Sequence, residues 1–211
     1  MGYQGSVSAM RAMDTGHQLD NLSDDEVKEI VNRWRDTNPK IRDLWYAFDS
    51  AAIQVINCGG SVNVRCVTFA REYDATRGVA SLTIRLPSGR KLFYVDPAVG
   101  ENRWGNPSIT YMGVNDKNKW GRIETYGGKL VENCVQAIAR DCLAQAIENL
   151  EAAGFPVVFH VHDEGVIDIE PFADEDTMLD QVVAAMSTPI PWAKGLPLNA
   201  AGWVGTFFKK D

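Results

Sequence analysis

Two adjacent acidic side chains, Asp163 and Glu164, follow His162 within residues 157–170, which read VVFHVHDEGVIDIE. Apolar, β-prone runs on both sides of the His-Asp-Glu-Gly stretch predict a hairpin whose turn carries these residues. Carboxylate oxygens are the hard ligands that Mg²⁺ prefers, and Mg²⁺ usually completes its shell with substrate phosphates. The pattern therefore indicates a metal site with Asp163 as a ligand. A polar turn selected only for its backbone conformation would give the same pattern.

A long helix is expected at 127–153, directly before the hairpin. Gly154 should end this helix, and Pro156 prevents its continuation. The polar side chains of Lys129, Asn133 and Gln136 lie near its start. Spacing at one turn and two turns of helix predicts a buried stripe formed by Val131, Val135, Ile138, Cys142, Ala146 and Leu150.

The remaining elements follow from periodicity and from turn residues. Ser23 and Glu26 form a capping box, and Asp174 is a candidate N-cap. In chain order we expect helices at 23–36 and 39–56, strands at 62–69, 80–86, 92–95 and 109–112 with a loop at 96–108, the long helix, the hairpin, a helix at 174–186 and a last strand at 202–209. Helices that pack on an antiparallel sheet make the fold class α+β.

Composition limits the classes of protein to consider. A chain of 211 residues fits one large domain, or one domain with a small appendage. A net charge of −7 argues mildly against a free-standing nucleic-acid binder. Local basic clusters fit phosphate contacts and solvated turns equally well, and they comprise Arg85, Arg90 and Lys91 and, further on, Lys117, Lys119 and Arg122.

The expected compartment is the cytoplasm. No apolar run is long enough to span a membrane, and no signal peptide opens the chain, so we expect no membrane partner. The four cysteines show no CxxC spacing, which favours reduced, structural thiols.

The motifs together resemble the C-terminal part of the phage branch of family A DNA polymerases. The helix residues 125–141, the His-Asp-Glu hairpin at 161–164, the start at 2–6 and the ending at 196–211 match that family in order and spacing. The resemblance implies a helical remnant of the fingers at 1–57. It also implies a palm subdomain with a β-hairpin extension at 58–211, which is built on an antiparallel palm-type sheet.

The resemblance also implies an activity, in which dNTPs are added to a primer 3′ end on a DNA primer-template. Asp163 matches the second metal-binding aspartate of a site for two Mg²⁺ ions, and Glu164 matches its auxiliary neighbour. His162 matches a histidine near the primer-terminal phosphate, and Gln136 matches a glutamine that contacts the minor groove. Tyr3 matches the nucleotide-binding tyrosine that closes the fingers helix, although simple helix packing would also explain this residue.

Two departures from the family pattern affect the expectations. The family places an arginine and an asparagine at one-turn spacing before the glutamine, where this chain has Gly128 and Glu132. Lys129 and Asn133 lie one residue away from these positions, and we take them as the DNA-binding candidates. The first metal-binding aspartate, the triphosphate-binding lysine and a thumb are not found.

We therefore expect activity only together with an upstream polymerase chain that carries the remaining motifs, in the cytoplasm of the host cell if a phage encodes the protein. Two alternatives stay open. The first is a non-catalytic palm remnant that binds DNA or a protein. The second is an unrelated metal-dependent phosphoesterase that uses His162, Asp163 and Glu164.

Overall fold

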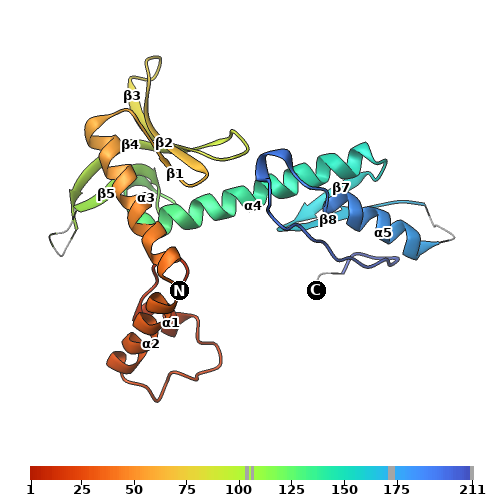
Figure 1. Cartoon of the computed structure of the whole chain (residues 1–211), viewed down its shortest axis with the longest axis horizontal. Coiled ribbons are helices and arrows are strands. Elements are labelled where there is room, and N and C mark those ends of the chain that lie inside the picture. Colours follow the sequence, from red (N-terminus) through yellow and green to blue (C-terminus); the bar gives the residue numbers. More distant parts are fainter. Residues whose placement is uncertain (103–104, 106, 171–173, 210–211) are drawn as a thin grey trace. The chain divides into compact units, whose positions relative to one another are not determined.

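The structure is a computed structural model that describes residues 1–102, 105, 107–170 and 174–209 (Figure 1). It divides into two compact units, Met1–Val135 and Gln136–Asp211, each of which is described by itself. Helices and antiparallel strands are present, so the expected α+β class is confirmed. No helix within the described part of the chain combines the length and the hydrophobicity needed to span a bilayer.

The first unit opens with three helices, α1 (Val7–Ala12), α2 (Asp24–Thr37) and α3 (Pro39–Cys58). The expected capping box is present at α2. The Ser23 hydroxyl accepts a hydrogen bond from the Glu26 N–H at 3.3 Å, and the Glu26 carboxylate accepts one from the Ser23 N–H at 2.8 Å. The predictions for α2 and α3 are confirmed to within two residues, whereas α1 was not predicted.

Helix α3 packs on one face of a six-stranded antiparallel sheet (Figure 1). The rings of Phe48 and Phe69 meet edge to face there, with centroids 5.1 Å apart. Each strand pairs with its neighbour in sequence, so the sheet is a meander. Its strands are β1 (Ser61–Val64), β2 (Val67–Asp74), β3 (Val79–Arg85), β4 (Lys91–Glu101), β5 (Pro107–Val114) and β6 (Trp120–Thr125).

Three details of this sheet differ from expectation. The single strand predicted at 62–69 is a hairpin, because the chain turns at Arg65, where φ is +54°. Strand β4 continues through much of the predicted loop, since a register shift between Val95 and Ala98 accommodates Pro97, and bulges are among the few places where a strand tolerates proline. Strand β6 was not predicted. Residues 103, 104 and 106 of the predicted loop lie outside the described residues.

Helix α4 (Gly127–Ala152) confirms the long helix, but its buried stripe was partly mispredicted. Val135 is 46% exposed. Val131, Ala146 and Leu150 are buried as predicted, and the other buried apolar residues of the helix are Leu130, Cys134 and Leu143.

The second unit contains a separate two-stranded sheet formed by β7 (Val157–Val161) and β8 (Glu164–Ile167), followed by α5 (Glu175–Met186) and a 3₁₀ turn (Pro191–Ala193). Asp174 caps α5 as expected. The strand predicted at 202–209 is absent from residues 202–209. Aromatic rings pack in pairs within this segment. The Trp203 ring contacts Phe207, and the Phe208 ring contacts Phe159 on β7. Residues 210 and 211 of the motif at the chain end lie outside the described residues.

Candidate functional site

The hairpin β7–β8 places one acidic side chain at its tip. Val161 pairs with Glu164, so the connection consists of only His162 and Asp163. Glu164 and Gly165 therefore lie in strand β8 and not in the turn, which corrects the prediction. His162 adopts a left-handed backbone, with φ at +50°, and Asp163 is exposed. Such a backbone is uncommon outside glycine, asparagine, aspartate and histidine.

The end of α4 positions this hairpin. Gly154, with φ at +88°, ends the helix, and the Phe155 N–H donates to the Leu150 carbonyl at 2.9 Å. The Glu151 carboxylate accepts a hydrogen bond at 2.7 Å from the N–H of Val157, the first residue of β7. The hairpin thus starts at a fixed point on the helix end.

A second set of contacts holds the hairpin along α4. The Arg140 guanidinium lies 3.4 Å from Nε2 of His160 on β7. A Cβ on Gly165 would lie 3.7 Å from Cδ1 of the buried Leu150, so β8 passes close to the helix. These contacts fix the strands that carry Asp163.

The acidic tip has the chemistry for a hard divalent cation but few ligands of its own. Asp163 offers exposed carboxylate oxygens, and Glu164 follows in a half-buried position. Among the described residues there is no group of three or more His, Cys, Asp or Glu side chains that could hold a metal ion. The tip can therefore supply only part of the ligand set that a hard cation such as Mg²⁺ requires.

Helix α4 carries three of the four predicted DNA-binding residues in its first three turns, and His162 is the fourth. Lys129 donates to the Glu132 carboxylate at 2.9 Å, and this hydrogen bond raises the pKa of Lys129. The Asn133 amide donates to the Tyr94 hydroxyl at 3.0 Å. Gln136 is exposed. Both Lys129 and Asn133 would have to exchange a protein partner for DNA.

The segment that carries Tyr3 abuts the start of α4. The Gln4 side-chain oxygen accepts a hydrogen bond from the Gly128 N–H at 3.0 Å. A Cβ on Gly128 would lie only 2.6 Å from the Tyr3 carbonyl oxygen. Within the first unit, the structure therefore brings Tyr3 beside the turn of α4 that carries Lys129. Gln136, His162, Asp163 and Glu164 belong to the second unit.

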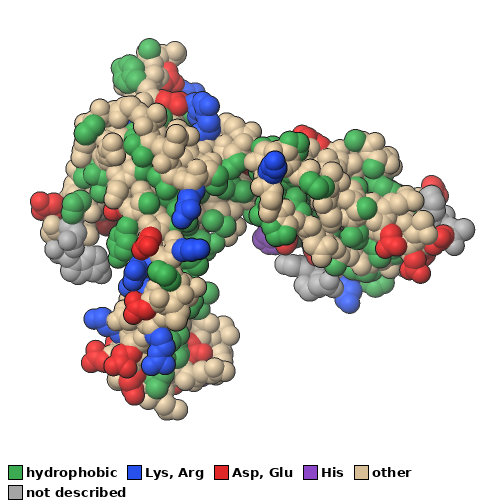
Figure 2. Space-filling model, viewed as in Figure 1, with side chains coloured by type: hydrophobic (Ala, Val, Ile, Leu, Met, Phe, Trp, Pro, Cys, Tyr) green, Lys and Arg blue, Asp and Glu red, His purple; other side chains and the backbone are tan. Residues whose placement is uncertain are grey.

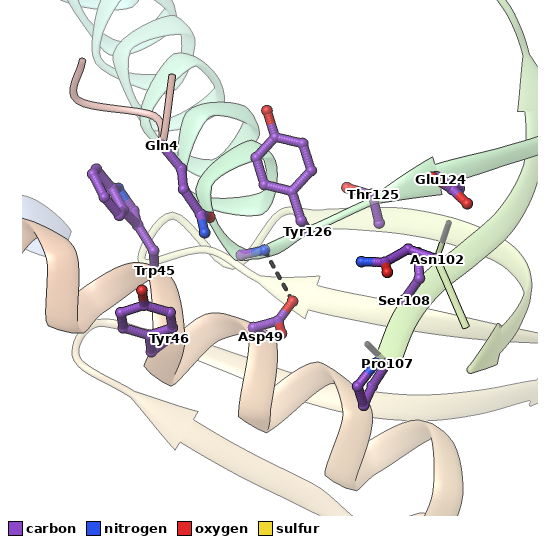
Figure 3. Close-up of a pocket in the computed structure, with 11 residues that line it drawn as sticks. Gln4, Trp45, Tyr46, Asp49, Asn102, Pro107, Ser108, Glu124, Thr125 and Tyr126 are labelled. Carbon is purple, nitrogen blue, oxygen red and sulfur yellow. Dashed lines mark hydrogen bonds between the residues drawn. The ribbon is translucent and has the colours of Figure 1, made fainter. Parts of the chain in front are cut away.

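The first unit also contains a cavity of about 650 Å³ that sequence reasoning missed (Figure 3). Its lining residues come from the chain start, from α3, from the residue after β4, from β5 and from the junction of β6 with α4, so no local sequence pattern predicts them. The Asp49 carboxylate accepts a hydrogen bond from the Gly127 N–H at its rim, and burial raises the pKa of Asp49. The buried Thr125 hydroxyl has no hydrogen-bond partner among the described residues.

Two residues of the basic clusters on the sheet, Lys91 and Arg122, form ion pairs with acids. Lys91 lies 2.7 Å from the Glu72 carboxylate and lowers the pKa of that group, and Arg122 pairs with Asp96. Figure 2 shows blue and red side chains interspersed over α1 and α2 in that view, without a continuous basic patch. For Lys91 and Arg122, these ion pairs favour a role at the solvated surface over phosphate contact.

Comparison with known proteins gives one informative match. No protein-family model and no solved structure matches the chain. A curated relative, the DNA polymerase of Bacillus phage SP02, is 44% identical over 213 residues that include all of this chain. The chain spans only 31% of the length of that polymerase. The resemblance to a phage DNA polymerase is therefore confirmed, and the chain is similar from end to end to one portion of such an enzyme.

Proposed function

We propose that this chain forms the fingers and palm portion of a family A DNA polymerase, with a fingers remnant at 1–57 and a palm subdomain at 58–211. In this proposal it takes part in the template-directed addition of dNTPs to a primer 3′ end. The observation that carries the proposal is the 44% identity, along the whole chain, to a phage DNA polymerase. The host-cell cytoplasm is the compartment that fits this function.

The chain's own residues have distinct parts in the proposed reaction. Asp163, exposed at the hairpin tip, would bind Mg²⁺, with Glu164 in support. When bound, two Mg²⁺ ions stabilise the attacking and leaving oxygens of an in-line displacement. His162 would hold the primer-terminal phosphate. Gln136 would contact the minor groove, where the hydrogen-bond acceptors lie at similar places in every correct base pair.

Further polymerase residues are needed to complete the site, and the second unit offers a place for them. Within the described residues, β7 and β8 pair only with each other, and a two-stranded sheet is marginally stable alone. Val158 and Phe159 on β7 are 57% and 45% exposed, and Val158 lies at a register shift where it has no partner on β8. We propose that strands of the remaining polymerase chain pair with this hairpin and bring the first metal-binding aspartate.

The test is single-turnover nucleotide incorporation by the chain assembled with the remaining polymerase segment. Asp163→Asn should reduce incorporation by at least about a hundredfold, since electrostatic stabilisation of the transition state depends on this charge. Asp168→Asn is the matched control, because Asp168 is also exposed but lies beyond β8. Thermal unfolding of both variants should match that of the parent chain.

Other outcomes would point to other functions. Near-normal incorporation by Asp163→Asn would mean that the tip is only a turn. Primer extension by the isolated chain would remove the need for a second segment. DNA binding without incorporation in any assembly would indicate a non-catalytic palm, and phosphoesterase activity of the isolated chain would indicate an unrelated enzyme.

A further inference from the structure

The backbone of residues 2–5, which carries Tyr3, is held by two side chains from the helices that follow it. The indole N–H of Trp45 on α3 donates to the Gly2 carbonyl at 2.7 Å. The Arg35 guanidinium on α2 donates to the Gly5 carbonyl at 3.2 Å and to the Gln4 carbonyl at 3.5 Å. Three carbonyl groups around Tyr3 are thus bound by side chains more than 29 positions away along the chain.

The two holding side chains are themselves fixed in place. Trp45 is 1% exposed and stacks on Trp34, with ring centroids 6.2 Å apart and planes 12° from parallel. The Arg35 guanidinium lies over the Trp45 ring, 5.9 Å from its centroid, which is within the range of cation–π attraction. Because the donors are already ordered, the segment that they bind has little freedom to move.

On its other side, the segment meets the glycine pair that opens α4. The Gln4 side-chain oxygen accepts a hydrogen bond from the Gly128 N–H. If Gly128 carried a Cβ atom, that atom would lie 2.4 Å from the Gln4 Cβ. A Cβ on Gly127 would lie 1.9 Å from the Trp45 carbonyl oxygen. Figure 3 shows Gln4 and Trp45 beside the start of α4. Only glycine permits this close approach, so α2, α3 and α4 together enclose the segment.

We propose that Trp45 and Arg35 are positioning residues that fix Tyr3 against the first turn of α4, and that nucleotide selection depends on them. This inference rests on the proposed function, in which Tyr3 lies at the nascent base pair. Displacement of Tyr3 would weaken the discrimination between correct and incorrect dNTPs, because specificity depends on differences in transition-state binding. The loss of one carbonyl-binding donor should therefore move Tyr3 without unfolding the chain.

The first arm of the test measures the position of Tyr3 by fluorine NMR of the chain labelled with fluorotyrosine. Tyr3→Phe assigns the resonance. Trp45→Phe keeps an aromatic ring but removes the N–H donor, and it should shift or broaden the Tyr3 resonance. Trp34→Phe is the matched control, because it keeps an aromatic ring against Trp45 and leaves the donors to residues 2–5 unchanged, and it should leave that resonance in place. Arg35→Gln, at a half-buried position, and Gly128→Ala should act like Trp45→Phe.

The second arm measures the ratio of kcat/KM for correct and incorrect dNTPs in the assembled polymerase. Trp45→Phe should lower this ratio about tenfold while kcat for the correct dNTP stays within about threefold. Trp34→Phe should leave the ratio unchanged. A Tyr3 resonance that stays in place in folded Arg35→Gln and Gly128→Ala would overturn the proposal, and so would an unchanged ratio in Trp45→Phe. A parent assembly that incorporates nothing would instead refute the proposed function, and the fluorine arm would then decide whether these side chains hold Tyr3.

Discussion

Asp49 on α3 accepts a hydrogen bond from the backbone N–H of Gly127 at 3.0 Å, which joins the helix before the sheet to the helix after it. Burial raises the pKa of Asp49 and outweighs the opposing effect of this hydrogen bond. The carboxylate therefore connects two helices, but its negative charge lies at a partly buried position where ionisation is less favourable than in water.

The first prediction concerns the effect of this charge on stability. Because the pKa of Asp49 in the folded chain is raised above its ordinary value of 3.8, the unfolded chain releases the proton first. The contribution of Asp49 to the free energy of unfolding therefore falls as pH rises from 3.8 through the pKa that Asp49 has in the folded chain. Asp49→Asn should keep the acceptor oxygen and show a higher free energy of unfolding than the parent at pH 7. The difference should vanish below pH 3.8.

Urea unfolding at several pH values measures this difference. Asp43→Asn, at an exposed position on the same helix, should not show the same pH dependence. A less stable Asp49→Asn at pH 7 would mean that the charged hydrogen bond outweighs the burial of the carboxylate.

The second prediction concerns the hydrogen bond from Asn133 to the Tyr94 hydroxyl. Tyr94 is buried, which raises its pKa, so the hydroxyl stays protonated and available as an acceptor. A double-mutant cycle with Asn133→Ala and Tyr94→Phe should give a coupling free energy of about 1 kcal/mol in unfolding experiments. A control cycle with Tyr111→Phe in place of Tyr94→Phe should give a coupling free energy near zero. Equal coupling free energies in the two cycles would refute a specific hydrogen bond between Asn133 and Tyr94.

The third prediction separates stability from activity at His162. Its φ of +50° suits glycine better than any branched residue. His162→Val should lower the free energy of unfolding by about 1 kcal/mol or more, whereas His162→Gly should leave it equal or higher. In the assembled polymerase, His162→Gly should still reduce incorporation. A His162→Val variant as stable as the parent would show that the turn adapts readily.

The fourth prediction concerns the unpaired hairpin. Val158→Lys should weaken association with the remaining polymerase segment, because it places a charge on an exposed strand that we expect to be covered. Val114→Lys is the matched control, since Val114 is 60% exposed at the end of β5. Light scattering of mixtures measures both. If both variants associate equally well with the remaining polymerase segment, that segment binds a surface other than the β7–β8 hairpin.

Local signals predicted helices α2 to α5 and the hairpin, because the causes of these elements are local. The capping box at Ser23 and the glycine stop at Gly154 each act within one turn. Helix α1 escaped prediction because it has six residues and no side-chain cap. Strand β6 alternates in burial, but Trp120 lies on its exposed face, so its sequence shows no clear alternation of apolar and polar residues.

The candidate site was predictable only where its parts adjoin in sequence. The His-Asp-Glu tip follows directly from its hairpin. The bond between Asn133 and Tyr94 joins residues 39 apart, and that between Trp45 and Gly2 joins residues 43 apart. Hydrophobic periodicity within one element does not predict contacts between residues so far apart in sequence. The hydrogen bonds from Trp45 and Arg35 to the segment around Tyr3 are therefore evident only in the structure.

The meander order of β1–β6 bears on how quickly the protein folds. Its widest pairings, Thr68 with Arg85 and Val95 with Met112, join residues only seventeen positions apart (85 − 68 and 112 − 95). Low contact order of this kind is associated with rapid folding, because little loop-closure entropy is lost before each pairing forms. The sheet can therefore assemble one hairpin at a time during synthesis, before α4 and the acidic hairpin have left the ribosome.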